Sequence, residues 1–279
     1  SGSGGSIKII SDYIKGKGII AANGGTNKNS GSGGRVAVYY KDIDNELINR
    51  IYSKGGESAE TDDYSIGAPG TIYLENVLTN EKRLIIDNLG ASIKGKAQYQ
   101  KTKIPSIGSG NVTSKNGNII TCSKSFPYSV IGLSIRFVKN GSILGDYEIV
   151  AQSGNTLTLD KEPSDEVVSS DFLGVIKINN LIIRNAVLET EDLLEVSGNI
   201  YLENNSKILA KANIFGDAYL SGNIGIFNDF YVYGDLYNQG NLTIYNNSYL
   251  YVQNDLKVLS GNITHQDTDL LNEYYLTLR

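Results

Sequence analysis

Short runs in which apolar and polar residues alternate one by one recur along the chain. Residues 199–202 (Asn-Ile-Tyr-Leu) and 242–245 (Leu-Thr-Ile-Tyr) are two of them, and both have the strand period of two without a helical stripe. Side chains alternate between the two faces of a strand, so each run has an apolar face and a polar face. The pattern predicts an all-β protein made of many short strands.

Polar turns between residues 197 and 264 repeat at intervals of about twenty residues. A Gly-Asn pair before an apolar residue recurs at spacings of 24, 18 and 21 residues, beginning at Gly198, Gly222, Gly240 and Gly261. A second series runs in phase with it at spacings of 18 and 20: Gly216-Asp217, Gly234-Asp235 and Asn254-Asp255. This period is typical of a β-solenoid, in which each coil is stabilised by stacking on its neighbours. We therefore predict a right-handed parallel β-helix with coils of about 20 residues over residues 176–279.

A glycine-rich segment over residues 1–100 carries a longer repeat. Stretches at 2–9, 31–38 and 67–74 share a glycine-rich lead followed by alternating apolar residues. The period of about 30 to 36 residues predicts solenoid coils with long polar loops outside the core. Because strands rather than a helix follow the glycines, we do not expect a phosphate-binding loop.

Residues 101–175 interrupt both repeats. Turn signals at Asn116-Gly117, Asn140-Gly141 and Gly154-Asn155 each lie between alternating apolar runs, which is the pattern of β-hairpins. The segment predicts a small antiparallel β subdomain of about five strands, inserted in the solenoid. Cys122 alternates with apolar neighbours in it and is expected to be a small core residue.

Composition and charge narrow the classes of function. The formal net charge is −5 without a basic cluster, which argues against nucleic-acid binding. No apolar run reaches the roughly 18 residues of a membrane span, and the single cysteine rules out an internal disulfide framework. The sequence begins with Ser1-Gly2 rather than Met, so a fragment of a longer or processed chain is expected.

Two of the glycine-rich stretches resemble a known kind of module. Residues 31–40 (Gly-Ser-Gly-Gly-Arg-Val-Ala-Val-Tyr-Tyr) and 67–74 (Gly-Ala-Pro-Gly-Thr-Ile-Tyr-Leu) are similar to the glycine-rich β-solenoid module of very large bacterial surface and secreted, adhesin-like proteins. The similarity extends over roughly residues 1–200. It implies an extracellular, mostly non-enzymatic structural or adhesive role beside neighbouring domains of one long chain. It carries over no ligand and no catalytic residue.

Tyrosines are the most distinctive candidates for binding, at nineteen against six phenylalanines and no tryptophan. If Ile200 and Leu202 point inward, Tyr201 points outward, and the same alternation places other tyrosines outside. The pairs at 231/233 and 249/251 are separated by one coil, so we expect them to stack into an aromatic strip. The candidate glycan-stacking residues are Tyr201, Tyr219, Tyr231, Tyr233, Tyr245, Tyr249 and Tyr251. The alternative is that these rings only stabilise the sheet through neighbouring-strand pairs.

Aspartates at the turns suggest two further chemistries. Stacked at about 4.8 Å per coil, they would be near enough to perturb each other's protonation or to hold Ca²⁺. Lyases and hydrolases of the β-helix type also place several carboxylates on one face. An Asp after Gly is equally ordinary turn chemistry, and no basic residue recurs beside the series to neutralise an acidic sugar. The candidate metal ligands are Asp62, Asp63, Asp217, Asp235 and Asp255.

These observations predict an extracellular structural and adhesive module of a large bacterial surface protein, without enzymatic activity, that binds polysaccharide through its outward tyrosines. The alternatives are a carbohydrate-active enzyme of the β-helix type and a stalk without a ligand. No cofactor other than Ca²⁺ is expected. A nucleophilic pair of Cys122 with His265 is not expected, because this single histidine is far from the cysteine in the sequence, near the end of the chain.

Overall fold

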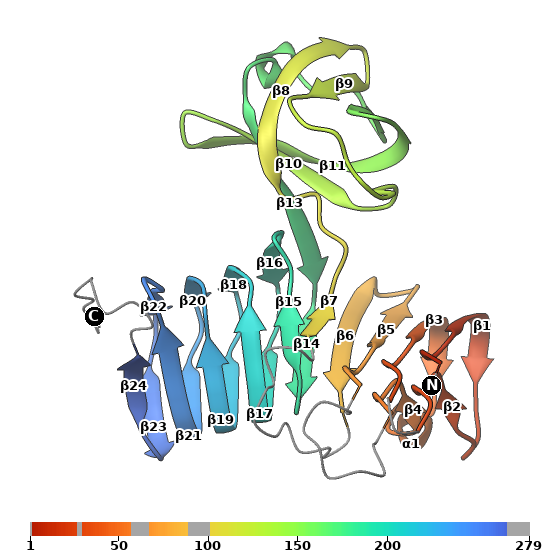
Figure 1. Cartoon of the computed structure of the whole chain (residues 1–279), viewed down its shortest axis with the longest axis vertical. Helices are drawn as coiled ribbons and strands as arrows, with labels where there is room; N and C mark the ends of the chain where they lie inside the picture. Colours follow the sequence, from red (N-terminus) through yellow and green to blue (C-terminus); the bar gives the residue numbers. More distant parts are fainter. Residues whose placement is uncertain (1, 27–29, 57–66, 89–100, 267–279) are drawn as a thin grey trace. The chain divides into compact units, whose positions relative to one another are not determined.

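The computed structural model describes residues 2–26, 30–56, 67–88 and 101–266. It is an all-β structure with one large, mostly parallel sheet and a six-stranded antiparallel barrel (Figure 1). The prediction of an all-β fold that combines parallel and antiparallel strands is confirmed. The chain divides into two compact units: Ser1–Lys103 with Ile178–Glu189 and Val196–Arg279, and Ile104–Lys177 with Thr190–Glu195.

The first unit contains the parallel strands and one short helix. Its large sheet has the strand order β1-β3-β5-β6-β14-β17-β19-β21-β23, and only the β5–β6 pair in this order is antiparallel. Its elements are β1 (Ser6–Ile14), β2 (Ile20–Ala21), β3 (Arg35–Ile43), α1 (Asn45–Ile48), β4 (Ile51–Tyr52), β5 (Thr71–Asn76), β6 (Glu81–Asp87), β7 (Lys101–Lys103), β14 (Asn180–Arg184), β15 (Val187–Glu189), β17 (Ile200–Leu209), β18 (Ala212–Ile214), β19 (Ala218–Ile226), β20 (Phe230–Val232), β21 (Leu236–Tyr245), β22 (Leu250–Val252), β23 (Leu256–Ser260) and β24 (Ile263–Gln266).

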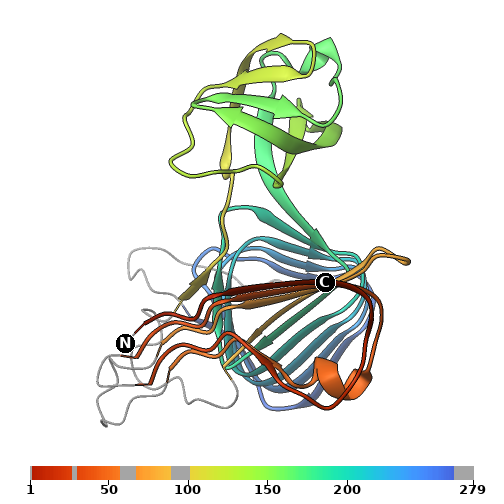
Figure 2. The same cartoon turned by 90° about the vertical axis from the view of Figure 1, so that its right-hand side faces the viewer.

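Strands that are one repeat apart in the sequence lie side by side in register. β17, β19 and β21 pair in parallel along their length, so that Ile200 lies beside Ala218 and Ala218 beside Leu236. Figure 2 shows the strands of this unit one behind the other. β18 and β20 pair with the same offset of 18, whereas β20 and β22 pair with an offset of 20. Inward positions are therefore occupied by the same class of residue at each step, and Ile200, Ala218 and Leu236 are fully buried.

Two fully buried positions of these strands break the apolar pattern: Ser206, which lies beside Ile224, and Asn238. Asn238 follows Leu202 and Leu220 in register and is fully buried. Opposite it, β23 has a register shift that gives this strand one extra residue. The amide Nδ2 of Asn238 donates a hydrogen bond to the carbonyl of Gly240 at 2.7 Å, so the side chain satisfies backbone beside the bulge.

The Gly-Asn pairs occupy two different places in the repeat, before a strand at Gly198 and within strands at Gly222 and Gly240, which corrects the single series expected from the sequence. Gly216 N–H donates to the Gly198 carbonyl at 3.0 Å, and Gly234 N–H donates to that of Gly216 at 3.1 Å. Gly222, in contrast, lies beside Asn204, and Gly240 beside Gly222. The pair at Gly198 therefore belongs with the Gly-Asp series. Asn and Asp are interchangeable there because both offer the same Oδ1 acceptor to the next turn.

Glycines allow close backbone contact in the N-terminal part of the first unit. The longer repeat is present as parallel pairing of the strands that follow the glycine-rich leads: Ser6 lies beside Arg35, and Arg35 beside Thr71. A Cβ added to Gly24 or Gly70 would lie 2.0 or 1.7 Å from a neighbouring carbonyl oxygen. The glycine-rich leads are therefore a packing requirement of the neighbouring backbones.

The second unit is a closed antiparallel barrel. Its strands are ordered β10-β11-β12-β9-β8-β13, and β10 also pairs with β13, which closes the circle of six strands. Gly117, Asn140 and Gly154 have positive φ at the expected hairpin turns. The elements are β8 (Ser109–Asn116), β9 (Ile119–Cys122), β10 (Ser134–Lys139), β11 (Ser142–Ser153), β12 (Thr156–Leu159), the 3₁₀ turn η2 (Asp165–Val167), β13 (Asp171–Ile178) and β16 (Leu193–Val196), of which β13 and β16 extend beyond the unit.

Replacing Gly70 by Ala should lower the free energy of unfolding by about 2 kcal/mol or more, because the new methyl group would overlap the Gly34 carbonyl. Gly18→Ala is the matched control, since nothing lies within 4 Å of a Cβ added there. Thermal and urea unfolding measure both variants. Equal stability of the two variants would contradict the close backbone packing.

Candidate functional site

Outward aromatic rings stack into ladders along the first unit. Tyr201, Tyr219 and Tyr237 occupy the same register position in β17, β19 and β21. Their ring centroids are 5.1 and 4.9 Å apart, with interplanar angles of 9° and 5°. These separations match the spacing of paired strands, so the register itself sets the stacking distance. The Lys257 ammonium lies 4.6 Å from the Tyr237 ring centroid and covers that end of the ladder.

Two shorter ladders follow the same rule. Phe215 stacks on Tyr233 at 5.1 Å, and Phe227 stacks on Tyr245 at 4.0 Å, both nearly face to face. Sugar rings bind aromatic side chains through the ring face, and in these ladders neighbouring rings already cover faces. Tyr201, Tyr219, Tyr233 and Tyr245 lie outside, as the alternation predicts, but their geometry favours sheet stabilisation over glycan stacking.

The remaining predicted tyrosines do not form the expected strip. Tyr231 lies beside Tyr251 and not beside Tyr249, because the connection that leads into β22 is longer than the one that leads into β20. The Tyr231 and Tyr251 rings are 6.1 Å apart and tilted by 46°. Tyr249 and Tyr251 are 64% and 41% exposed. Tyr233 meets Tyr251 edge-on, with ring centroids 6.5 Å apart and an interplanar angle of 63°, so the two pairs touch but do not stack face to face as expected.

Sequence reasoning missed Tyr237, Phe215, Phe227 and Lys257 as members of the ladders. The signal for Tyr237 was present, since the tyrosines at 201, 219 and 237 recur with the period of the Gly-Asp turns. Phe215 and Phe227 could not be assigned without the turn conformations, because each lies just after a strand.

The turn aspartates form a ladder of side-chain-to-backbone hydrogen bonds. Oδ1 of Asn199 accepts from the Asp217 N–H at 2.9 Å, and Oδ1 of Asp217 accepts from the Asp235 N–H at 2.9 Å. Oδ1 of Asp235 accepts from the Asp255 N–H at 3.2 Å. Tyr219 donates its hydroxyl to the second oxygen of Asp217 at 3.1 Å. The carboxylates of Asp217 and Asp235 thus accept hydrogen bonds from the backbone of the next turn and from tyrosine hydroxyls of the aromatic ladder.

These hydrogen bonds shift the pKa values of two groups in the ladders, Asp235 and Tyr219. The hydrogen bond from the Lys257 ammonium, aided by the Asp255 N–H, holds the pKa of Asp235 below its ordinary value. The pKa of Tyr219 is raised by desolvation in the stack and by its bond to the Asp217 carboxylate. Both shifts of pKa favour the ionised form of Asp235 and the protonated form of Tyr219, which are the forms that their hydrogen bonds require.

The predicted metal ligands do not converge. Within the described ranges, no three His, Cys, Asp or Glu side chains lie close enough to hold one ion. Asp217, Asp235 and Asp255 are instead distributed along the hydrogen-bond ladder, one at each turn. Asp62 and Asp63 lie outside the described residues.

Cys122 lies in the core of the barrel, as expected from its apolar neighbours. It is 1% exposed, and burial raises the pKa of its thiol to about 12, so the nucleophilic thiolate is scarce at neutral pH. Nε2 of His265 lies 2.8 Å from the Asn246 carbonyl.

Acidic groups of the barrel unit serve its own packing. Arg136 is nearly buried and forms two-pronged pairs with Asp146 (2.6 and 2.7 Å) and Glu195 (2.6 and 2.9 Å). Asp192 accepts the N–H groups of Ile107 and Gly108, while desolvation raises its pKa. These groups orient chain segments.

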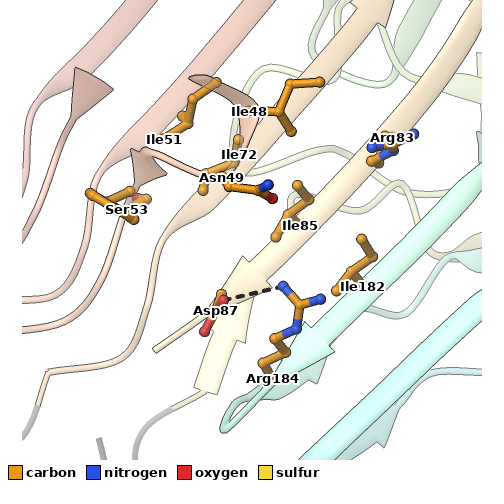
Figure 3. Close-up of a pocket in the computed structure, with 11 residues that line it drawn as sticks. Ile48, Asn49, Ile51, Ser53, Ile72, Arg83, Ile85, Asp87, Ile182 and Arg184 are labelled. Atoms are coloured by element: carbon orange, nitrogen blue, oxygen red, sulfur yellow. Dashed lines mark ion pairs between the residues drawn. The ribbon is translucent and has the colours of Figure 1, made fainter. Parts of the chain in front are cut away.

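A hollow of about 210 Å³ lies beside α1 and β4 (Figure 3). Isoleucines from β4, β5, β6 and β14 line it, together with the side chains of Asn49, Arg83 and Arg184. Arg184 pairs with Asp87 at 3.6 Å and with Glu203 at 2.7 Å. A second, more open hollow adjoins the first, because both are lined by Asn49 and Tyr52. Sequence reasoning gave no signal for this place.

No protein-family model and no curated protein matches the sequence. Among solved structures, the chain is similar to the tailspike of Acinetobacter baumannii bacteriophage AP22 in complex with A. baumannii capsular saccharide. The TM-score is 0.19 and the sequence identity 9%, over 99% of this chain and 62% of that chain. The chain therefore spans less than two thirds of the tailspike. A likeness at this level carries no argument about fold or function. No helix among the described residues is long and apolar enough to span a membrane.

Replacing Asp217 by Asn should change the free energy of unfolding by less than about 0.5 kcal/mol, because Asn199 already fills the equivalent place one turn earlier. Asp217→Ala should cost about 1 kcal/mol, since the Asp235 N–H loses its acceptor. Urea unfolding of the two variants measures the difference. Both proteins are also unfolded with added Ca²⁺. The purely structural role would be contradicted if the Asn variant were much less stable than the wild type and if Ca²⁺ stabilised only the wild type.

Proposed function

We propose that this chain is a structural and adhesive module of a large extracellular bacterial surface protein, and that its parallel layers form a right-handed β-solenoid. Right-handed connections are the rule between parallel strands of one sheet. Stacked layers each contact only their neighbours, which makes an extended, regular support for other domains. The glycine-rich resemblance over residues 1–200 points to the same kind of protein.

One observation carries the structural part of this proposal: outward groups are engaged with the next repeat. The tyrosine ladder, the turn-aspartate ladder and an asparagine ladder all run along the stacking direction. In the asparagine ladder, Asn223 donates to Asn205 and Asn241 donates to Asn223, each at 3.0 Å. Side chains used in this way strengthen the contact between repeats and leave few groups for chemistry.

Polysaccharide binding is a second candidate function, favoured by the open rings of Tyr249 and Tyr251, with Tyr231 beside them. These three side chains lie on β20 and β22 or next to them, and Tyr249 has no ring partner among the described residues. The Lys211 ammonium lies 5.6 Å from the Tyr231 ring centroid, and Tyr251 contacts the rings of Tyr231 and Tyr233, so Tyr249 offers the freest face of the three. An aromatic ring with a free face and a hydroxyl edge can stack on a sugar and donate a hydrogen bond to it.

An enzyme of the β-helix type remains the other alternative to binding. It would need carboxylates free to donate or accept a proton at a substrate. Asp217 and Asp235 are engaged by backbone N–H groups, a tyrosine hydroxyl or a lysine, which favours the structural proposal over catalysis by this series.

Tyr219→Ala should lower the free energy of unfolding by about 2 kcal/mol, because the middle ring of the ladder loses two stacking partners and the bond to Asp217. Tyr249→Ala should cost less than about 0.5 kcal/mol, since that side chain is 64% exposed and stacks on no ring of the described residues. Thermal and urea unfolding compare them. Similar stability of the two variants would contradict the proposal that the ladders hold the module together.

A further inference from the structure

The edge of the large sheet at β1 is one end of a stack of three coils that begin with glycine. These coils start at the glycine-rich leads 2–5, 31–34 and 67–70, and their first long strands are β1, β3 and β5. β3 pairs in parallel with β1 on one side and with β5 on the other. β1 is the first strand in the sheet order (Figure 1), so among the described residues no strand pairs with its outer side. An unpaired strand edge is a template for a further strand.

Backbone hydrogen bonds join each coil to the coil before it. Arg35 N–H donates to the Gly5 carbonyl at 3.0 Å, and Thr71 N–H donates to the Gly34 carbonyl at 3.1 Å. Ser6 is the equivalent residue of the first coil, because it lies beside Arg35. Equivalent residues of paired parallel strands direct their N–H groups the same way. The Ser6 N–H is therefore directed toward the place of a preceding coil.

The apolar interior of the stack is open on the same side. Four isoleucines of the first coil are only half-buried, whereas the residues beside them in the second coil are at most 8% exposed. The pairs are Ile7 with Val36, Ile9 with Val38, Ile14 with Ile43, and Ile20 with Ile51. A further layer on this edge would remove the isoleucines from water, which is the main stabilising contribution between stacked repeats.

A glycine on this edge has no partner that requires it. A Cβ added to Gly34 would lie 1.9 Å from the Gly5 carbonyl oxygen, and one added to Gly70 would lie 1.7 Å from the Gly34 carbonyl oxygen. At Gly5, the equivalent position of the first coil, nothing lies within 4 Å of an added Cβ, and φ is not in the left-handed region. Glycine loses more conformational freedom on folding than any other residue. The carbonyl of a preceding coil would account for glycine at this position.

The layer that fits on this edge must itself contain glycine. A Cβ added to Gly4 would lie 2.4 Å from the Gly34 nitrogen of the next coil, and one added to Gly33 would lie 2.4 Å from the Gly70 nitrogen. A lead that packs on Gly5 in the same way therefore also needs glycine at the place equivalent to Gly4.

We propose that β1 and the lead 2–5 bind a further glycine-led coil of the same long chain, stacked in parallel and in register before the first coil. The contact continues the interface that joins β1 to β3 and β3 to β5. It pairs the outer side of β1, covers the half-buried isoleucines and places a carbonyl against Gly5. The inference rests on the proposed function, in which the chain is a module of a large solenoid protein.

An extended chain tests this edge, with a second copy of residues 2–30 joined before Gly2 in place of Ser1. The added coil then precedes the first coil by 29 residues, which is the offset between Ser6 and Arg35. Hydrogen exchange measured by mass spectrometry reports on the amides of β1. We expect these amides to exchange at least about tenfold more slowly in the extended chain, because a paired strand must open before it exchanges.

Gly5→Ala then tests the predicted close contact. Without the extension it should change the melting temperature by less than about 1 °C, since nothing lies near the new methyl group. In the extended chain it should abolish the gained protection of β1, because the methyl group would overlap the carbonyl of the added coil. The matched control is the same substitution at the equivalent glycine of the added copy, which faces open space and should have no effect.

Three results would overturn the proposal. The first is unchanged exchange of β1 in the extended chain, and the second is an equal effect of Gly5→Ala with and without the extension. The third is slow exchange of β1 in a dimer of the unextended chain, identified by analytical ultracentrifugation, which would assign the edge to a second copy. If Gly70→Ala is still destabilising, such a result refutes only the edge. If Gly70→Ala is neutral as well, the stacking of the coils and the proposed solenoid fail together.

Discussion

The in-register pairing of parallel strands that are one repeat apart is the constraint on which the first unit depends. Because Ile200, Ala218 and Leu236 lie side by side, the remaining positions of these strands also lie beside their equivalents one repeat away. Inward positions become continuous, mostly apolar rows, in which Ser206 and Asn238 are polar, and outward positions become ladders of like side chains. The spacing of paired strands brings aromatic rings to stacking distance and turn amides to hydrogen-bond distance without further adjustment.

The same constraint decides which side chains are available for binding. A tyrosine whose neighbours in register are also aromatic presents only its edge, as Tyr219 does between Tyr201 and Tyr237. A tyrosine where the repeat is interrupted keeps its face. Tyr249 and Tyr251 lie where the offset between paired strands increases. In this fold, therefore, binding surfaces are expected at irregularities of the stack and not along its regular part.

The sequence predicts the repeats well where their turns are of constant length. The glycine-rich stretches pair as expected, and the hairpin signals of the barrel fall at residues with positive φ such as Gly117 and Asn140. The register could not be predicted where a turn gains residues. Spacing alone cannot distinguish a regular step with a longer turn from a different strand pairing. Spacing placed Gly198 in the wrong series for that reason. The hollow beside α1 and β4 could not be predicted, because its lining comes from strands that are far apart in the sequence.

Disulfide trapping tests the central register most directly. With Asn205→Cys and Asn223→Cys, the two cysteines should cross-link readily, because these positions are paired on β17 and β19. Asn199→Cys with Asn223→Cys should not cross-link, although alignment of the first two Gly-Asn pairs would bring these positions together. The native Cys122 is buried and does not compete. Cross-linking of the first pair alone is the predicted result, and cross-linking of the second pair alone would contradict this register and the ladders that follow from it.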